Sequence, residues 1–263
     1  MMADEREIYC ETLGKGPPLV LLHPFTTNHN FWCPLAPELA KTHRLFLPDF
    51  RGHGASLAGP EPITMAQHCA DLERILDSNH VKRAIFFGVS MGGYILFEFW
   101  RRSRERVQAL ILCDTRAQAD APDERNGRLQ DAGSVLRDGT EKFWQQMMSR
   151  LVGETTRSNQ PGTVAATQAL WDSMRPEGVA GALRGLAERA DSVATLKSIN
   201  VPTLIIVGEE DTRTPPADAE LMHREIRGSA FARIPRAGHF AALEQPEAVL
   251  AVVQPFLQKA AAL

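Results

Sequence analysis

Hydrophobic residues form two kinds of pattern along this chain: short unbroken runs, and segments in which they recur every three or four positions. Unbroken runs are typical of strands that are buried on both faces of a parallel sheet. The predicted strands are residues 19–22, 45–47, 84–87, 107–112 and 203–207, with a weaker strand at 230–234 and an edge strand at 8–13.

Segments with helical spacing lie between most of these runs, at residues 31–40, 65–76, 94–100, 217–226 and 247–257. Strands that alternate with helices indicate βαβ units and a mostly parallel sheet, which places the chain in the α/β class. With 263 residues, of which 44% are hydrophobic, the chain can form one large core with a small inserted subdomain.

One long stretch, residues 115–198, contains no convincing strand. Helical spacing recurs in it at 123–136, 141–151, 163–174 and 179–189. The stretch is rich in tryptophan, methionine and leucine, so disorder is disfavoured. We therefore predict a helical cap over the C-terminal ends of the strands, where open α/β sheets bind ligands. Residues 1–114 and 199–263 would then form the core domain, and residues 115–198 the cap.

The run Gly88-Val89-Ser90-Met91-Gly92 follows the predicted strand 84–87 and precedes a helical segment. A serine hydroxyl becomes a useful nucleophile when a sharp strand-to-helix turn exposes it, and small residues on both sides permit that turn. Such a short pattern also arises by chance, but its place at a strand end favours Ser90 as a nucleophile.

A serine nucleophile needs a base, and the base needs a group that orients it. His239 follows the last predicted strand, and Asp211 follows the strand 203–207. With Ser90 they occur in the order Ser, Asp, His, each just past a strand end, so all three are expected on one edge of the sheet. Asp114 is a rival acid, and Glu209 and Glu210 are weaker rivals.

Acyl transfer also requires hydrogen-bond donors for the oxyanion that develops. The backbone N–H of Met91 is one candidate, since it starts a helix where amide groups are unpaired. The other candidate is the N–H of Phe25, in the loop after strand 19–22. Its neighbour Pro24 has no N–H to donate, and His23 is interpreted as a packed structural histidine.

A third polar motif, Asp49-Phe50-Arg51-Gly52-His53-Gly54-Ala55-Ser56, follows strand 45–47. Its acidic, basic and histidine side chains resemble a second catalytic set. No nucleophile at a strand-to-helix turn accompanies them, however, so a structural loop is the preferred interpretation.

Composition excludes several classes of partner. The net charge is −3, with no basic cluster, which argues against nucleic acid and anionic membranes. The acidic start, residues 1–7, does not resemble a signal peptide, and no apolar run is long enough to span a membrane. The four cysteines have no C-x-x-C spacing, and no ligand cluster predicts a metal. A cytoplasmic protein without metal or cofactor is expected; its oligomeric state is left open.

Taken together, these motifs resemble the α/β-hydrolase superfamily over nearly the whole chain outside the cap. They are His23-Pro24-Phe25, the Asp49–Ser56 loop, Gly88–Gly93, Gly208-Glu209-Glu210-Asp211 and Gly238-His239-Phe240. The resemblance implies a mostly parallel eight-stranded sheet with helices on both faces. It also implies nucleophile, acid and base roles for Ser90, Asp211 and His239, and an oxyanion hole at Phe25 and Met91. The chain departs from the family at one position, since Pro24 stands after His23 where the family more commonly has glycine.

A weaker resemblance is to small microbial esterases and lactonases, including the 3-oxoadipate enol-lactonase-like group. It is carried by residues 238–247 and 114–120. The leading hypothesis is a serine hydrolase that cleaves a small-molecule ester or lactone through an acyl-enzyme. Carbon–carbon bond hydrolysis or cofactor-free perhydrolysis is the alternative on the same residues, and a non-catalytic ligand receptor is the alternative of another class.

Substrate contacts are expected mainly from the cap. The candidate wall residues are Phe25, Phe143, Trp144, Met147 and Trp171, which could equally serve only to pack the cap on the core. Arg116, Arg125 and Arg128 lie near the start of the cap and could bind a substrate carboxylate, Arg116 first among them. The sequence does not identify the acyl or leaving group.

Overall fold

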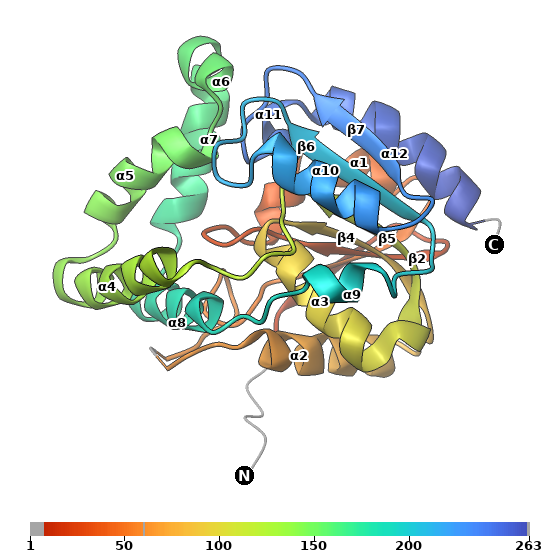
Figure 1. Cartoon of the computed structure of the whole chain (residues 1–263), viewed down its shortest axis with the longest axis horizontal. Coiled ribbons are helices and arrows are strands. Elements are labelled where there is room, and N and C mark those ends of the chain that lie inside the picture. The colour runs from red at the N-terminus through yellow and green to blue at the C-terminus, as the bar shows by residue number, and fades with distance from the viewer. Residues whose placement is uncertain (1–7, 60, 262–263) are drawn as a thin grey trace.

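The computed structural model describes residues 8–59 and 61–261, and within them a single seven-stranded sheet (Figure 1). The order across the sheet is β1-β3-β2-β4-β5-β6-β7, with β1 antiparallel to β3 and the other neighbours parallel. The strands are β1 Cys10–Leu13, β2 Pro18–Leu22, β3 Arg44–Pro48, β4 Ala84–Val89, β5 Val107–Cys113, β6 Thr203–Gly208 and β7 Ala230–Ile234. The expectation for residues 1–7 lies outside the described residues.

The predicted α/β fold and its mostly parallel sheet are confirmed, including the edge strand near the N-terminus. The strand count is a correction, because the resemblance implied eight strands and the described residues form seven. The hydrophobic pattern itself contained only seven apolar segments. The segments between these strands are loops and helices, so they add no further hydrogen-bonded strand to the sheet of the described residues.

Helices cover both faces of the sheet, because alternate residues of each buried strand point to opposite sides. Leu19 and Leu21 of β2 belong to one hydrophobic cluster, and Val20 and Leu22 belong to the other. The helices on the first side are α1 Ala36–Leu39 and α12 Pro246–Ala261. Those on the second side are α2 Met65–Ser78, α3 Met91–Ser103 and α10 Pro216–Glu225.

The predicted helix at 31–40 is wrong in extent. The chain instead forms a 3-10 helix, η1 His29–Trp32, and then the single turn α1. Pro34 lies between them and Pro37 follows in α1, and a proline supplies no N–H to continue a helix. Short elements elsewhere are η2 Arg104–Arg106, α9 Val193–Leu196 and α11 Ala241–Glu244.

The stretch between β5 and β6 is helical, as the sequence predicted. We call its main helices the cap helices; they are α4 Pro122–Asp138, α5 Glu141–Leu151, α6 Glu154–Asn159, α7 Pro161–Asp172 and α8 Pro176–Ala187. They gather at one side of the sheet, on the left of Figure 1. That residues 115–198 form a unit separate from the core stays a prediction. Within residues 8–59 and 61–261, no helix is both long and apolar enough to cross a membrane.

Candidate active site

Ser90 stands at a sharp turn between β4 and α3. Its φ and ψ are 50° and −109°, a conformation that residues other than glycine rarely adopt. The turn is held by neighbouring groups: the Ser90 N–H donates to the Cys113 carbonyl at 3.0 Å, and the Thr115 hydroxyl donates to the Ser90 carbonyl at 2.8 Å. Such strain persists only where surrounding contacts over-determine it, and it is typical of functional residues.

The two glycines around Ser90 are required by close packing. A Cβ atom on Gly88 would lie 2.6 Å from the Gly92 carbonyl carbon, and one on Gly92 would lie 2.3 Å from the Leu22 carbonyl oxygen. Both distances are shorter than real Cβ contacts. Helix α3 can therefore approach the ends of β2 and β4 only with glycine at these positions, as the G-x-S-x-G pattern predicted.

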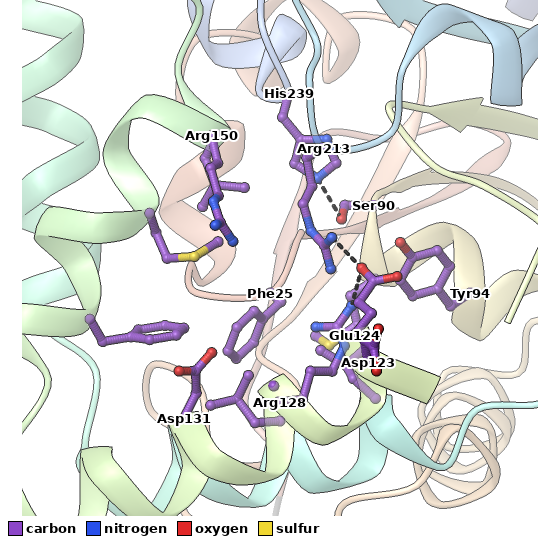
Figure 2. Close-up of a pocket in the computed structure, with 17 residues that line it drawn as sticks. Phe25, Ser90, Tyr94, Asp123, Glu124, Arg128, Asp131, Arg150, Arg213 and His239 are labelled. Atoms are coloured by element: carbon purple, nitrogen blue, oxygen red, sulfur yellow. Dashed lines mark hydrogen bonds and ion pairs between the residues drawn. The ribbon is translucent and has the colours of Figure 1, made fainter. Parts of the chain in front are cut away.

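His239 lies between the serine and an aspartate. Its Nε2 is 2.7 Å from Ser90 Oγ, and its Nδ1 is 2.8 Å from Asp211 Oδ2 (Figure 2 shows Ser90 and His239). A carboxylate only accepts, so Nδ1 carries the hydrogen and Nε2 presents its lone pair to the serine hydroxyl. The three residues are buried, so water competes little for these hydrogen bonds.

Further hydrogen bonds hold Asp211 as a carboxylate. Its Oδ1 accepts the N–H groups of Arg213 and Thr214 at 2.8 and 2.9 Å, and its Oδ2 accepts the Thr214 hydroxyl at 2.7 Å. Burial opposes ionisation, but the His239 imidazole and the hydrogen bonds from Thr214 outweigh it and hold the pKa of Asp211 below its ordinary value.

The rival acid, Asp114, serves another purpose in the structure. Its Oδ1 accepts the Gly208 N–H at 2.8 Å and its Oδ2 accepts the Ala241 N–H at 3.0 Å. Burial, together with the nearby Asp211 charge, raises the pKa of Asp114 well above its ordinary value. Asp114 thus links the ends of β5 and β6 to the loop after His239. Glu209 is exposed, and Glu210 turns to the cap, where it accepts the Thr155 N–H.

The two predicted oxyanion donors lie close to the serine. Met91 is the first residue of α3, and Phe25 follows β2; both line one cavity with Ser90 and His239. The neighbouring His23 donates from Nδ1 to the Pro24 carbonyl at 2.8 Å and accepts the Phe50 N–H at Nε2. Burial holds the pKa of His23 well below its ordinary value. The structural role predicted for His23 is confirmed.

The Asp49 loop is structural, as predicted. Asp49 accepts the His29 N–H at 2.7 Å and the Ala55 N–H at 2.8 Å. Arg51 forms a buried ion pair with Asp71 of α2 at 2.6 Å. These contacts tie the loop after β3 to the loop after β2 and to a core helix.

A cavity of about 240 Å³ lies beside Ser90 and is lined by residues of the core and of the cap helices (Figure 2). Its apolar lining includes Phe25, Met91, Phe143, Met147, Leu151 and Leu183. Its charged lining is Asp123, Glu124, Arg128, Asp131, Arg150 and Arg213. The cavity can therefore receive a hydrocarbon group against its apolar side chains, and it also offers charges of both signs.

Not every predicted wall residue reaches this cavity. Phe25, Phe143 and Met147 line it, but the described lining does not include Trp144 or Trp171. These two indoles stack with ring centres 5.4 Å apart, and the Trp171 Nε1–H donates to the Thr26 hydroxyl at 3.0 Å. Trp144 and Trp171 pack the cap on the core, which was the alternative the sequence left open.

The expectation for Arg116 is also corrected. It does not belong to the described cavity lining, and its guanidinium is held by Asp120 and Glu124. Arg128 does line the cavity but is paired with Asp120, and Arg125 is exposed. Burial opposes ionisation of Asp120, yet Arg128 and Arg189 hold its pKa below its ordinary value.

The sequence analysis did not predict two arginines that line the cavity. Arg213 follows the acid loop and pairs with Glu124 of α4, while Arg150 projects from the end of α5 (Figure 2). The signal for Arg213 is its place two positions after Asp211. Nothing in the local pattern distinguishes Arg150, because only the packing of α5 directs it to the cavity.

Comparison with known proteins agrees with this fold. Residues 17–246 match the family model described as alpha/beta hydrolase fold. The chain is 30% identical to 3-oxoadipate enol-lactonase 1 of Acinetobacter baylyi, over 92% of this chain and 89% of the relative. It is 29% identical to a putative 2-succinyl-6-hydroxy-2,4-cyclohexadiene-1-carboxylate synthase of Bacillus subtilis, over 91% and 89%.

Among solved structures, a thermophilic esterase from Thermogutta terrifontis with malate bound superimposes with a TM-score of 0.96. The two chains are 37% identical, and the match covers 99% of this chain and 96% of the esterase. The serine turn, the sheet order and these matches lead to one conclusion: the chain belongs to the α/β-hydrolase family.

Proposed function

We propose that this protein is a serine hydrolase that cleaves a carboxylic ester or lactone of a small molecule. The observation that carries the proposal is the chain of hydrogen bonds from Asp211 through His239 to Ser90, at the floor of a cavity of substrate size. Nucleophile, base and orienting acid stand in the order that acyl transfer requires.

In the proposed reaction, Ser90 Oγ attacks the substrate carbonyl while His239 Nε2 takes the hydroxyl proton. The oxyanion of the tetrahedral intermediate accepts the N–H groups of Met91 and Phe25. The intermediate then collapses, the carbon–oxygen bond breaks, and His239 returns the proton to the leaving oxygen. Water, activated by the same imidazole, hydrolyses the acyl-enzyme and frees Ser90. Apart from the substrate and one water molecule, each step uses a side chain or backbone group of the chain.

The cap helices give the proposal its substrate site. We infer that residues 115–198 act as a cap over the core formed by residues 1–114 and 199–263. Phe25 of the core and Phe143 of α5 pack edge to face with ring centres 6.3 Å apart, and Met147 of α5 lines the same cavity. An acyl or alkyl group placed against these side chains would hold its carbonyl near Ser90.

The names of the relatives support a hydrolytic role without fixing the bond that is cleaved. An enol-lactonase and an esterase act on carbon–oxygen bonds, whereas the Bacillus relative is named as a synthase. Carbon–carbon bond hydrolysis or perhydrolysis therefore remains the alternative on the same three residues. A receptor without turnover is the alternative of another class.

A survey of initial rates tests the proposal. It compares short p-nitrophenyl esters, simple lactones, acidic enol-lactones and a β-diketone, with and without hydrogen peroxide, for the wild-type protein and Ser90→Ala. Ester or lactone turnover that disappears in Ser90→Ala supports the proposal. Turnover of the diketone alone would favour carbon–carbon cleavage, and binding without turnover of any substrate would favour the receptor.

A further inference from the structure

Glu244 is a buried carboxylate that takes no part in the hydrogen bonds at Ser90. It lies five residues after His239 and is only 2% exposed. Its Oε1 accepts the N–H groups of Gly238 and Phe240, each at 3.1 Å, so it grips the backbone on both sides of His239. Burying a charge is costly unless hydrogen bonds compensate it, and these amides provide that compensation.

The second oxygen of Glu244 reaches the cap. Oε2 accepts the Gly153 N–H at 2.9 Å, just before helix α6. The same cap segment also meets His239 directly, because the His239 N–H donates to the Leu151 carbonyl at 3.1 Å. Residues 151–153 are therefore hydrogen-bonded both to the proposed base and to the glutamate that holds its loop.

A second glutamate binds this segment from the neighbouring loop. Glu210, next to Asp211, accepts the Thr155 N–H at 2.8 Å and also the Thr155 hydroxyl. The loop that carries the acid and the short helix α11 that follows the base thus each supply one glutamate to residues 151–155. We call residues 151–155 the docking segment.

We propose that Glu244 is a positioning residue that sets the place of the His239 imidazole relative to Ser90 and makes it depend on the docking segment. The inference rests on the proposed function. Within the described chain, the residues that line the cavity do not include Glu244, so it acts through His239 and not on the substrate. Because both of its oxygens accept N–H groups, the role requires an ionised carboxylate, although burial raises the pKa of Glu244.

Close packing at Gly153 allows the same contact to be disturbed from the cap. A Cβ atom there would lie 2.7 Å from Gly238 N and from Glu210 Oε2, and 2.9 Å from Glu244 Oε2. The φ of Gly153 is −59°, which alanine adopts without strain. Gly153→Ala should therefore push the docking segment off both glutamates without distorting the local backbone.

The first test is Glu244→Gln, with Glu247→Gln on the exposed first turn of α12 as the matched control. The amide has nearly the same shape but brings an NH₂ group against a backbone N–H. We expect kcat for a short p-nitrophenyl ester to fall by about 10- to 100-fold, as a misplaced catalytic group would cause. KM should change by less than about twofold, because substrate contacts remain. The control should keep the wild-type rate.

Titration with an organophosphonate separates positioning from simple loss of folded protein. In Glu244→Gln the number of labelled sites per chain should match the wild type, while the rate of labelling falls with kcat. A reduced number of sites that react at the wild-type rate would overturn the proposal and leave Glu244 a purely structural residue. If the wild type itself is not labelled at Ser90, the proposed function fails first, and this inference fails with it.

The second test is Gly153→Ala, with Gly162→Ala as its control, since a Cβ atom on Gly162 meets nothing within 4 Å. We expect Gly153→Ala to lower kcat in the same way and Gly162→Ala to leave it unchanged. The double variant Glu244→Gln with Gly153→Ala should be no slower than the slower single variant, because both changes break one linkage. If the fold-losses of kcat in the two single variants multiply in the double variant, or if Gly153→Ala keeps the wild-type kcat, the dependence on the docking segment is overturned.

Discussion

The Asp211 carboxylate lies 2.8 Å from Nδ1 of His239, although the two residues are 28 positions apart in the chain. The contact fixes the histidine tautomer, since a carboxylate at Nδ1 leaves Nε2 to accept the serine proton. It also distinguishes Asp211 from Asp114, whose oxygens accept backbone N–H groups at Gly208 and Ala241.

We predict that Asp211→Asn retains its fold but loses about 10⁴-fold in kcat, because an amide at Nδ1 favours the wrong tautomer. Asp114→Asn should instead lower the melting temperature, since one of its two backbone contacts is lost, with a much smaller effect on kcat per folded molecule. Steady-state kinetics and thermal unfolding of both variants check this pair. A larger kcat loss in Asp114→Asn would show that the acid has been misassigned.

For Ser90 we predict that an organophosphonate labels this serine, as found by peptide mass spectrometry. Ser90→Ala should not be labelled and should lose about 10³-fold or more in kcat, with a residual rate from the oxyanion donors. A label on a different serine, or an esterase rate in Ser90→Ala equal to the wild type, would exclude Ser90 as the nucleophile.

Substrate charge can be tested at Arg150. No ion pair is found for this cavity residue within the described part of the chain, whereas Arg116 is held by Asp120 and Glu124. If the substrate carries a carboxylate, Arg150→Ala should raise KM for it by about 10- to 100-fold, the size expected for one hydrogen bond to a charged group.

KM for a neutral ester should not change in Arg150→Ala, which provides the internal control. Arg137→Ala, on the exposed part of α4, serves as the control variant. Equal changes in KM for acidic and neutral substrates, or no change at all, would argue against an acidic substrate and would favour a short-chain esterase. A selective effect of Arg116→Ala would restore the expectation made from the sequence.

Buried histidines predict how stability depends on pH. Burial lowers the pKa of His53 to about 4 and that of His68 to about 3. At a pH between these lowered pKa values and about 6.5, the two histidines are protonated in the unfolded chain and neutral in the folded chain. The free energy of unfolding should therefore fall as the pH falls from about 6.5 toward 4, by up to about 1.4 kcal/mol per pH unit for each histidine.

Urea unfolding at pH 7.5 and pH 5 measures this effect. His68→Phe removes one titrating group and keeps an aromatic ring against Phe50, whose ring centre lies 4.8 Å from that of His68. The variant should lose less stability between the two pH values than the wild type does. An identical loss in both proteins would mean that His68 does not contribute to the pH dependence.

Local pattern was sufficient to locate the strands and the serine turn. A strand buried on both faces must be apolar throughout, and the tight turn at Ser90 demands small residues at Gly88 and Gly92. These constraints act within a few residues, so a single sequence displays them. The helix at 31–40 failed for a local reason as well, because Pro34 and Pro37 interrupt the amphipathic spacing.

The chain order of Ser90, Asp211 and His239 indicated a common edge of the sheet, but the choice between Asp211 and Asp114 required the loops to be folded. Which aromatic residues line the cavity depended on tertiary packing even more. Trp144 and Phe143 are adjacent in the sequence and both aromatic, yet only Phe143 lines the cavity. The direction of a side chain on a cap helix is set by how that helix docks, which no local pattern encodes.

The sequence by itself thus determined the α/β sheet, the turn at Ser90 and the three residues on its edge, because periodicity and turn chemistry are local properties. The tertiary structure decided which acid meets His239, that Arg150 rather than Arg116 reaches the cavity, and that Glu244 joins the histidine loop to the cap. Those outcomes depend on contacts between segments far apart in the chain, whose geometry exists only once the core and the cap helices have packed.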